Sequence, residues 1–124
     1  MFRPLAATTA FLPIALLLAF VLITTPVLAH HGWSSYDVER EMTVEAPIEQ
    51  VYYGNPHVSI DISHGGNQWH VVLAPISRMS ARGLPDGALQ AGKTVTITGY
   101  PRHDGELELR AERIVVDGRT VELR

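Results

Sequence analysis

Residues 58–73, VSIDISHGGNQWHVVL, alternate apolar and polar side chains on both sides of a Gly-Gly pair. Two alternating runs joined by such a pair are typical of a β-hairpin with a tight turn. If the turn is centred on the two glycines, Ile62 faces Trp69 and Ile60 faces Val71, so apolar side chains meet apolar side chains. A shift of one residue would expose all of them to water. The segment therefore predicts two paired strands with one buried face.

The segment before the hairpin also alternates with a period of two, which indicates a strand. Apolar side chains occupy every second position from residue 42 to residue 48, and the parity then changes near Glu49-Gln50. We interpret the change as a β-bulge in one long first strand.

The segment after the hairpin predicts one short helix and further strands. Residues 77–84 are compatible with a helix, in which Ser77 is the N-cap and Gly83 follows the last turn. Residues 94–98, TVTIT, are rich in β-branched side chains and predict a strand that ends at Gly99. Two Asp-Gly pairs then predict turns around another strand: Asp104-Gly105, Asp117-Gly118 and the strand Leu107 to Val116.

The order of these elements is three strands, a short helix, and two or three strands. A long bent first strand and a helix between the third and fourth strands match a five-stranded barrel of the OB type. We therefore expect an all-β chain with small α content, folded as a five- to six-stranded OB-like barrel with that one helix. An open sandwich of similar strand number is the alternative.

An apolar run, residues 11–28, follows a short region whose only charged side chain is Arg3. Pro26 would interrupt a helix, and Val27-Leu28-Ala29 satisfies the small-residue pattern of a signal-peptide cleavage site. We therefore expect a periplasmic or secreted bacterial protein that keeps no stable membrane anchor. An uncleaved anchor is the alternative, because a run of about 18 residues approaches the length of a transmembrane helix.

This division gives a cleaved signal peptide (1–29), an N-terminal arm (30–41) and a barrel domain (42–124). The first segment contains one of the ten basic residues and none of the thirteen acidic ones, so the mature chain has a net charge of −4. An acidic domain lacks the basic surface that phosphate groups require, which argues against a nucleic-acid partner. The chain contains no cysteine, so disulfides and thiolate ligands are excluded.

Cleavage after Ala29 would place two histidines, His30 and His31, at the mature N-terminus. A terminal amine beside imidazoles is a nitrogen-rich ligand set that suits Cu(II). His57 supplies a third imidazole if the arm folds back to the barrel. We therefore predict a copper-type metal site formed by His30, His31 and His57. The competing interpretation is that these histidines are ordinary surface residues.

Two further groups of side chains are candidates for binding. The hairpin register places Asp61 opposite His70 on the outward face, where a carboxylate can orient an imidazole. Trp33, Tyr52 and Tyr53 are candidates for an aromatic binding surface. These groups support the alternative function, a barrel that binds a periplasmic protein or a small ligand and whose histidines are incidental.

The sequence contains no nucleophile elbow, His-Glu-x-x-His helix, phosphate loop or dinucleotide motif. Glu106, Glu108 and Arg110 alternate along a strand and are interpreted as a solvated charged face. We therefore expect a binding or accessory module rather than an enzyme.

Three motifs carry a resemblance: AHHGW at residues 29–33, NPH at residues 55–57 and AGKTVTITGY at residues 91–100. With them the chain resembles the exported bacterial family of unknown function DUF6152, over nearly the whole mature domain. The resemblance implies export and a small barrel, and it implies no activity.

Overall fold

The computed structural model describes residues 2–4 and 32–124, and within them the chain forms six strands and one α-helix. The elements are the 3-10 helix η1 (Trp33–Ser35), β1 (Met42–Tyr52), β2 (Ser59–His64), β3 (Asn67–Val72), α1 (Ile76–Ala81), β4 (Thr94–Pro101), β5 (Glu108–Val116) and β6 (Arg119–Glu122). The predicted cleavage site after Ala29 and the histidines His30 and His31 lie outside the described residues.

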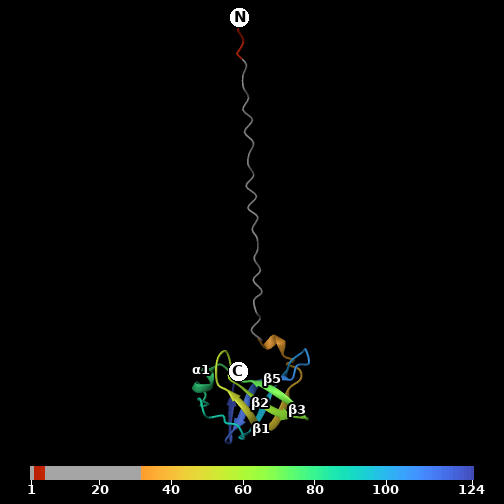
Figure 1. Ribbon diagram of the computed structural model, residues 1–124, viewed down its shortest axis with the longest axis vertical. Helices are drawn as coiled ribbons and strands as arrows, with labels where there is room; N and C mark the ends of the chain where they lie inside the picture. Colours follow the sequence, from red (N-terminus) through yellow and green to blue (C-terminus); the bar gives the residue numbers. More distant parts are fainter. Residues whose placement is uncertain (1, 5–31) are drawn as a thin grey trace.

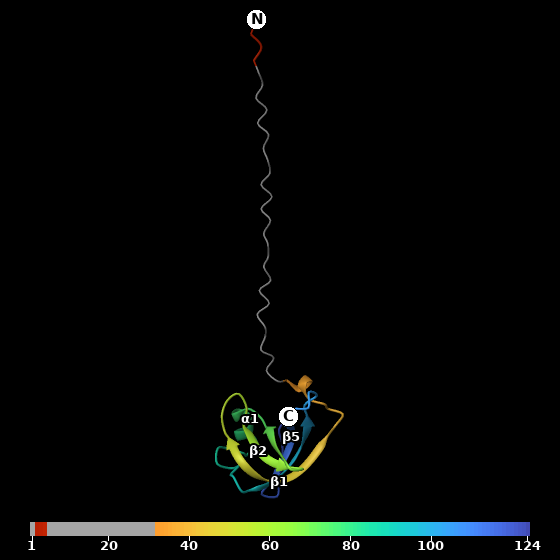
Figure 2. The ribbon, with the colours of Figure 1, turned by 45° about the vertical axis from the view of Figure 1, so that its right-hand side comes forward.

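The sheet closes on itself and forms a barrel (Figures 1 and 2). Its strand order is β3-β2-β1-β4-β5-β6, and a parallel pairing of β3 with β5 joins the ends of a five-stranded cylinder. The sixth strand, β6, pairs antiparallel with β5. The predicted OB-like barrel is confirmed, and the alternative of an open sandwich is wrong.

Strand β1 belongs to both halves of the barrel because it bends. Met42–Pro47 pair with β4, whereas the residues from Ile48 onward pair with β2. The register shifts between Ile48 and Gln50, where the sequence predicts a bulge. An extra residue at this point turns the strand from one neighbour to the other, as barrel closure requires.

The hairpin of β2 and β3 has the predicted register. Ile62 pairs with Trp69 and Ile60 with Val71. The two glycines of the turn have φ angles of 58° and 80°. Both angles lie in the left-handed region, so the turn needs residues without a Cβ atom.

Helix α1 begins two residues earlier than the sequence predicts. Its N-cap is Pro75, and no side chain caps it, so the prediction of Ser77 as N-cap is wrong. Ile76 packs against the core at the first position of the helix, and this burial places the start of the helix. The predicted end is confirmed, because Gly83 has a φ of 88° and the N–H of Leu84 donates to the carbonyl of Met79 at 2.8 Å.

Strand β4 continues through Gly99 to Pro101, so the prediction that it ends at Gly99 is wrong. A Cβ atom at Gly99 would lie 2.4 Å from the backbone oxygen of Arg110 on β5. The glycine therefore permits a close approach of two strands, next to a register shift between Thr98 and Gly99.

The core fills the barrel and continues under the helix. It contains inward side chains of all six strands, together with Met79 and Leu84 from the region of α1, and most of them are less than 5% exposed. None of the helices in the described ranges is long and apolar enough to cross a lipid bilayer. Because the core fills the inside of the barrel, a binding site is expected on its outer face or in its loops.

Candidate functional site

The arm is held against the barrel by Trp33. The guanidinium carbons of Arg110 and Arg124 lie 5.1 and 4.5 Å from the centroid of its ring system. The rings of Tyr36 and Tyr100 meet it edge-on, with centroids at 6.4 and 6.0 Å. Cation–π and edge-to-face contacts of this kind attach η1 to β4, β5 and the C-terminus.

Tyr36 is the second attachment point of the arm. Its side chain is 1% exposed, and its hydroxyl donates a hydrogen bond to Glu108 on β5. Burial, followed by the hydrogen bond to Glu108, raises the pKa of Tyr36 well above its ordinary value. The neighbouring backbone N–H of Asp37 donates to the carbonyl of Pro101 at 2.8 Å. These contacts give the part of the arm from Trp33 to Asp37 a defined position on the barrel.

Arg110 lies beneath the arm and is only 8% exposed, although strand alternation places it on the outer face. The interpretation of Glu106, Glu108 and Arg110 as one solvated charged face is therefore wrong, because the arm covers Arg110. Burial lowers the pKa of its guanidinium. The sequence offers little sign of this role, because the contact joins segments about 75 residues apart.

The same guanidinium contacts His57. Its Nη2 lies 3.5 Å from Nε2 of the imidazole, which is half-buried after the loop that follows β1. The guanidinium of Arg110 thus contacts two residues of the predicted sites, Trp33 and His57. Within residues 2–4 and 32–124, no three His, Asp or Glu side chains gather as a metal site.

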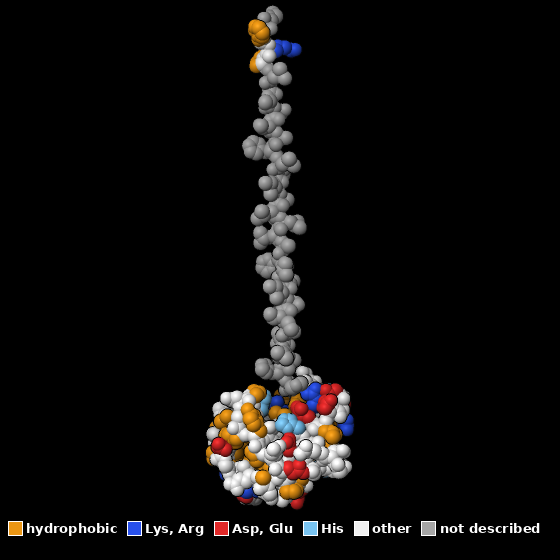
Figure 3. Space-filling model, in the orientation of Figure 1, with side chains coloured by type: hydrophobic (Ala, Val, Ile, Leu, Met, Phe, Trp, Pro, Cys, Tyr) orange, Lys and Arg blue, Asp and Glu red, His pale blue; other side chains and the backbone are white. Residues whose placement is uncertain are grey.

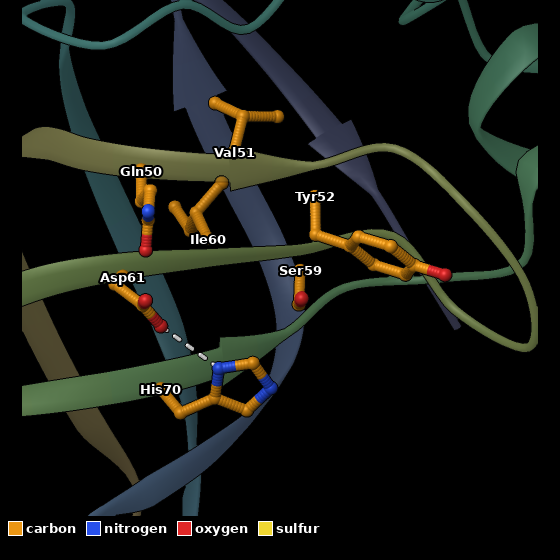
Figure 4. Close-up of a pocket in the computed structure, with 7 residues that line it drawn as sticks. All are labelled: Gln50, Val51, Tyr52, Ser59, Ile60, Asp61 and His70. Carbon is orange, nitrogen blue, oxygen red and sulfur yellow. Dashed lines mark hydrogen bonds and ion pairs between the residues drawn. The ribbon is translucent and has the colours of Figure 1, made fainter.

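The Asp61–His70 pair is formed as the register predicts. Nδ1 of His70 lies 2.8 Å from Oδ1 of Asp61, and the imidazole is half exposed. Figure 4 shows the other ring nitrogen pointing away from Asp61, along the surface of the sheet. A carboxylate on Nδ1 favours the tautomer in which Nε2 accepts hydrogen bonds.

A groove surrounds this pair on the outer face of β1, β2 and β3. Its volume is about 250 Å³, and its lining consists of Gln50, Val51, Tyr52, Ser59, Ile60, Asp61 and His70. A second hollow of about 380 Å³ adjoins it at His70 and is lined by Arg102, Glu106, Leu107 and Glu108. Figure 3 shows histidine side chains beside acidic and basic side chains at one end of the barrel. Sequence reasoning missed Gln50, which the outward parity after the bulge could have identified, and Ser59, which the alternation along β2 places on the same outer face.

The predicted aromatic surface is divided between different surroundings. Tyr52 is 57% exposed, whereas Tyr53 is half-buried and its hydroxyl donates to the carbonyl of Leu84 at 2.9 Å. Among the described residues, ring contacts join Trp33 to Tyr36 and Tyr100 and to neither tyrosine of that surface. Tyr52 therefore belongs to the groove, Tyr53 to the packing of α1, and Trp33 to the arm.

Comparison with known proteins gives a family and no activity. No curated protein matches the chain. Residues 19–109 match DUF6152, which is described as a family of unknown function. The matched range runs through the NPH triplet before β2 and the first four strands, and it ends at the start of β5. Because the match covers well over half of the sequence, the chain belongs to the DUF6152 family.

Proposed function

We propose that this protein is an exported periplasmic binding module whose mature N-terminus holds a Cu(II)-type ion. The observation that supports the proposal best is the position of Trp33, which packs on Arg110 beside His57. Two residues of chain span at most about 7 Å, so the Cα atom of His31 is no farther than that from the Cα atom of Trp33. The arm is therefore attached where a terminal metal site would lie next to the barrel.

The proposed ligands are the amine and imidazole of His30 and the imidazole of His31. Amine and imidazole nitrogens suit the tetragonal geometry of Cu(II) better than the tetrahedral geometry of Zn²⁺. The site depends on cleavage after Ala29, because only a terminal His30 has a free amine. Signal-peptide removal would thus create the site as well as release the protein.

His57 has a different position in this proposal. A neutral imidazole has one acceptor nitrogen, and Nε2 of His57 faces the guanidinium of Arg110 at 3.5 Å. When Nε2 accepts from Arg110, His57 has no lone pair for a metal. The two terminal histidines are therefore the primary ligands, and His57 joins them only by leaving Arg110.

The test is Cu(II) binding by protein that an expression host has exported and processed. Intact mass identifies the first residue, titration gives the affinity and stoichiometry, and EPR gives the ligand nitrogens. The variant His30→Ala/His31→Ala should lose tight binding, and a single alanine inserted before His30 should weaken it without removing any side chain. His64→Ala, in the exposed hairpin turn, is the matched control.

Each outcome separates one part of the proposal from the others. Tight binding that survives both the double substitution and the inserted alanine would show that the terminal site is wrong. If His57→Ala alone abolished binding, His57 would be a ligand. Its imidazole would then have to leave Arg110 in order to bind the metal. A mass that includes residues before His30 on functional protein would overturn the site together with the predicted cleavage.

A further inference from the structure

The groove on the outer face of β1, β2 and β3 contains a continuous polar row. Gln50 pairs with Asp61, Asp61 pairs with His70, and His70 pairs with Glu108, so the row crosses four neighbouring strands. Strand alternation directs these side chains away from the core, which begins at Ile60 and Val71 beneath them. None of these residues takes part in the metal site proposed above, so the groove is an independent candidate.

The groove has a rigid aromatic side chain at its rim. The ring of Tyr52 lies over Gly54, where a Cβ atom would come within 2.5 Å of Cζ of the tyrosine. The hydroxyl donates to the backbone oxygen of Asn55 at 3.0 Å. One face of the ring is thus supported while the side chain remains 57% exposed. A fixed aromatic ring gives contact area with little loss of conformational entropy on binding.

The polar groups of the groove are mixed donors and acceptors. Gln50 supplies both kinds of group, as does Ser59, which is only 6% exposed, while Asp61 and Nε2 of His70 accept hydrogen bonds in the tautomer described above. Among the residues that the structure describes, no Lys or Arg lines the hollow beside Tyr52. Such a lining suits neither a phosphate nor a carboxylate, and it suits hydroxyl groups, which donate and accept at once.

We propose that this groove binds a neutral polyhydroxylated ligand, a segment of an oligosaccharide. Tyr52 contacts the apolar face of one sugar ring, and Gln50, Asp61 and His70 bond its hydroxyl groups. The adjoining hollow at Leu107 and Glu108 receives the next ring of the chain. The two hollows share His70, so one extended ligand can occupy both. A single-stranded nucleic acid would also stack on Tyr52, but the acidic chain and the absence of basic side chains in the first hollow disfavour it.

The experiment uses the full chain after processing by an expression host. An array of neutral and anionic oligosaccharides, with a single-stranded DNA 12-mer alongside, identifies the class of ligand. The tightest neutral probe is then titrated into ¹⁵N-labelled protein, and the amide shifts locate the site. Tyr52→Ala should weaken binding about tenfold, from the loss of an aromatic contact. Gly54→Ala should weaken it similarly, because the methyl group displaces the ring of Tyr52.

Controls and a chelator separate this proposal from the metal site. His70→Ala should weaken binding, whereas His64→Ala removes an exposed histidine outside the groove and should leave it unchanged. EDTA should also leave it unchanged, since no proposed metal ligand lies in the groove. Absence of binding to every neutral oligosaccharide would overturn the proposal. Preference for DNA or anionic sugars, or amide shifts that map away from β1, β2 and β3, would overturn it as well.

Discussion

At the residue scale, Arg102 and Asp104 form a charged, hydrogen-bonded pair in the loop that follows β4. Nε of Arg102 donates to Oδ1 of Asp104 at 2.9 Å, and the backbone N–H of Glu106 donates to the same oxygen at 3.1 Å. The hydrogen bond from Arg102, followed by that from Glu106, lowers the pKa of the Asp104 carboxyl to about 2. This pair stabilises the loop that borders the second hollow of the groove.

The pKa of Asp104 predicts a pH dependence of folding. Since the carboxyl has a lower pKa in the folded chain, its contribution is present above the unfolded value of about 3.9 and is lost as the pH falls toward 2. The free energies of unfolding of the protein and of Asp104→Asn, measured with urea, should therefore differ at pH 5 to 6 and converge as the pH falls below about 2. NMR titration of Arg102→Gln should show the pKa of Asp104 nearer its ordinary value. An equal difference in stability at every pH would contradict this assignment.

Helix α1 shows, at the scale of one element, which end is determined locally. Its C-terminal end is local, because Gly83 adopts a positive φ and Leu84 closes the last turn onto Met79. Its N-terminal end depends on tertiary packing, since Ile76 contacts the core and Pro75 precedes it with a φ of −59°. Ser77 has the chemistry of an N-cap and lies inside the helix instead.

Two substitutions in this region should have different effects. Ser77→Ala should change the free energy of unfolding by less than about 0.5 kcal/mol, because the exposed hydroxyl caps nothing. Gly83→Ala should cost about 1–2 kcal/mol, because a Cβ atom is strained at a φ of 88°. Urea unfolding of both variants measures the two effects. A loss of about 1 kcal/mol in Ser77→Ala would restore Ser77 as the N-cap.

At the scale of the whole molecule, β6 and the residue after it, Leu123, contribute buried side chains to the core. Val121 and Leu123 are buried in the core, although they lie beyond the range that matches the family. The backbone N–H of Leu123 donates to the carbonyl of Glu112 at 2.8 Å, and its carbonyl accepts from Arg78 at 3.0 Å. The backbone of Leu123 therefore links β5 to α1 through these two hydrogen bonds.

Truncation of Leu123 should destabilise the whole barrel. Leu123→Ala removes a side chain that is 1% exposed and should cost about 2–5 kcal/mol, because the cavity it leaves cannot collapse inside a closed sheet. Thr120→Ala, on the exposed side of the preceding strand β6, should change stability by less than about 0.5 kcal/mol. Thermal and urea unfolding compare the two variants. Equal stabilities would mean that the buried side chain of Leu123 does not contribute to the stability of the fold.

The sequence predicted the neighbours of a candidate-site residue where their positions depend on the local pairing of two strands. The Gly-Gly turn determines the register, so the sequence alone predicted Asp61 opposite His70. It did not predict the groove around them, because strand parity places Gln50 on the outer face and does not show that it pairs with Asp61. The contacts of Arg110 with Trp33 and His57 were equally inaccessible, since they join three distant segments.

The alternating pattern, the turn glycines and the order of elements determined the strands from the sequence by itself and favoured an OB-like barrel over an open sandwich, a choice that the pairing of β3 with β5 settled. These features act over a few residues, where side-chain period and backbone conformation are decided. Tertiary structure alone decided where strands approach too closely for a side chain, as at Gly99, and which charged residue the arm buries, as at Arg110. Both outcomes depend on contacts between separate segments, because Gly99 on β4 meets Arg110 on β5 and the arm packs on Arg110 through Trp33, and no local pattern encodes those distances.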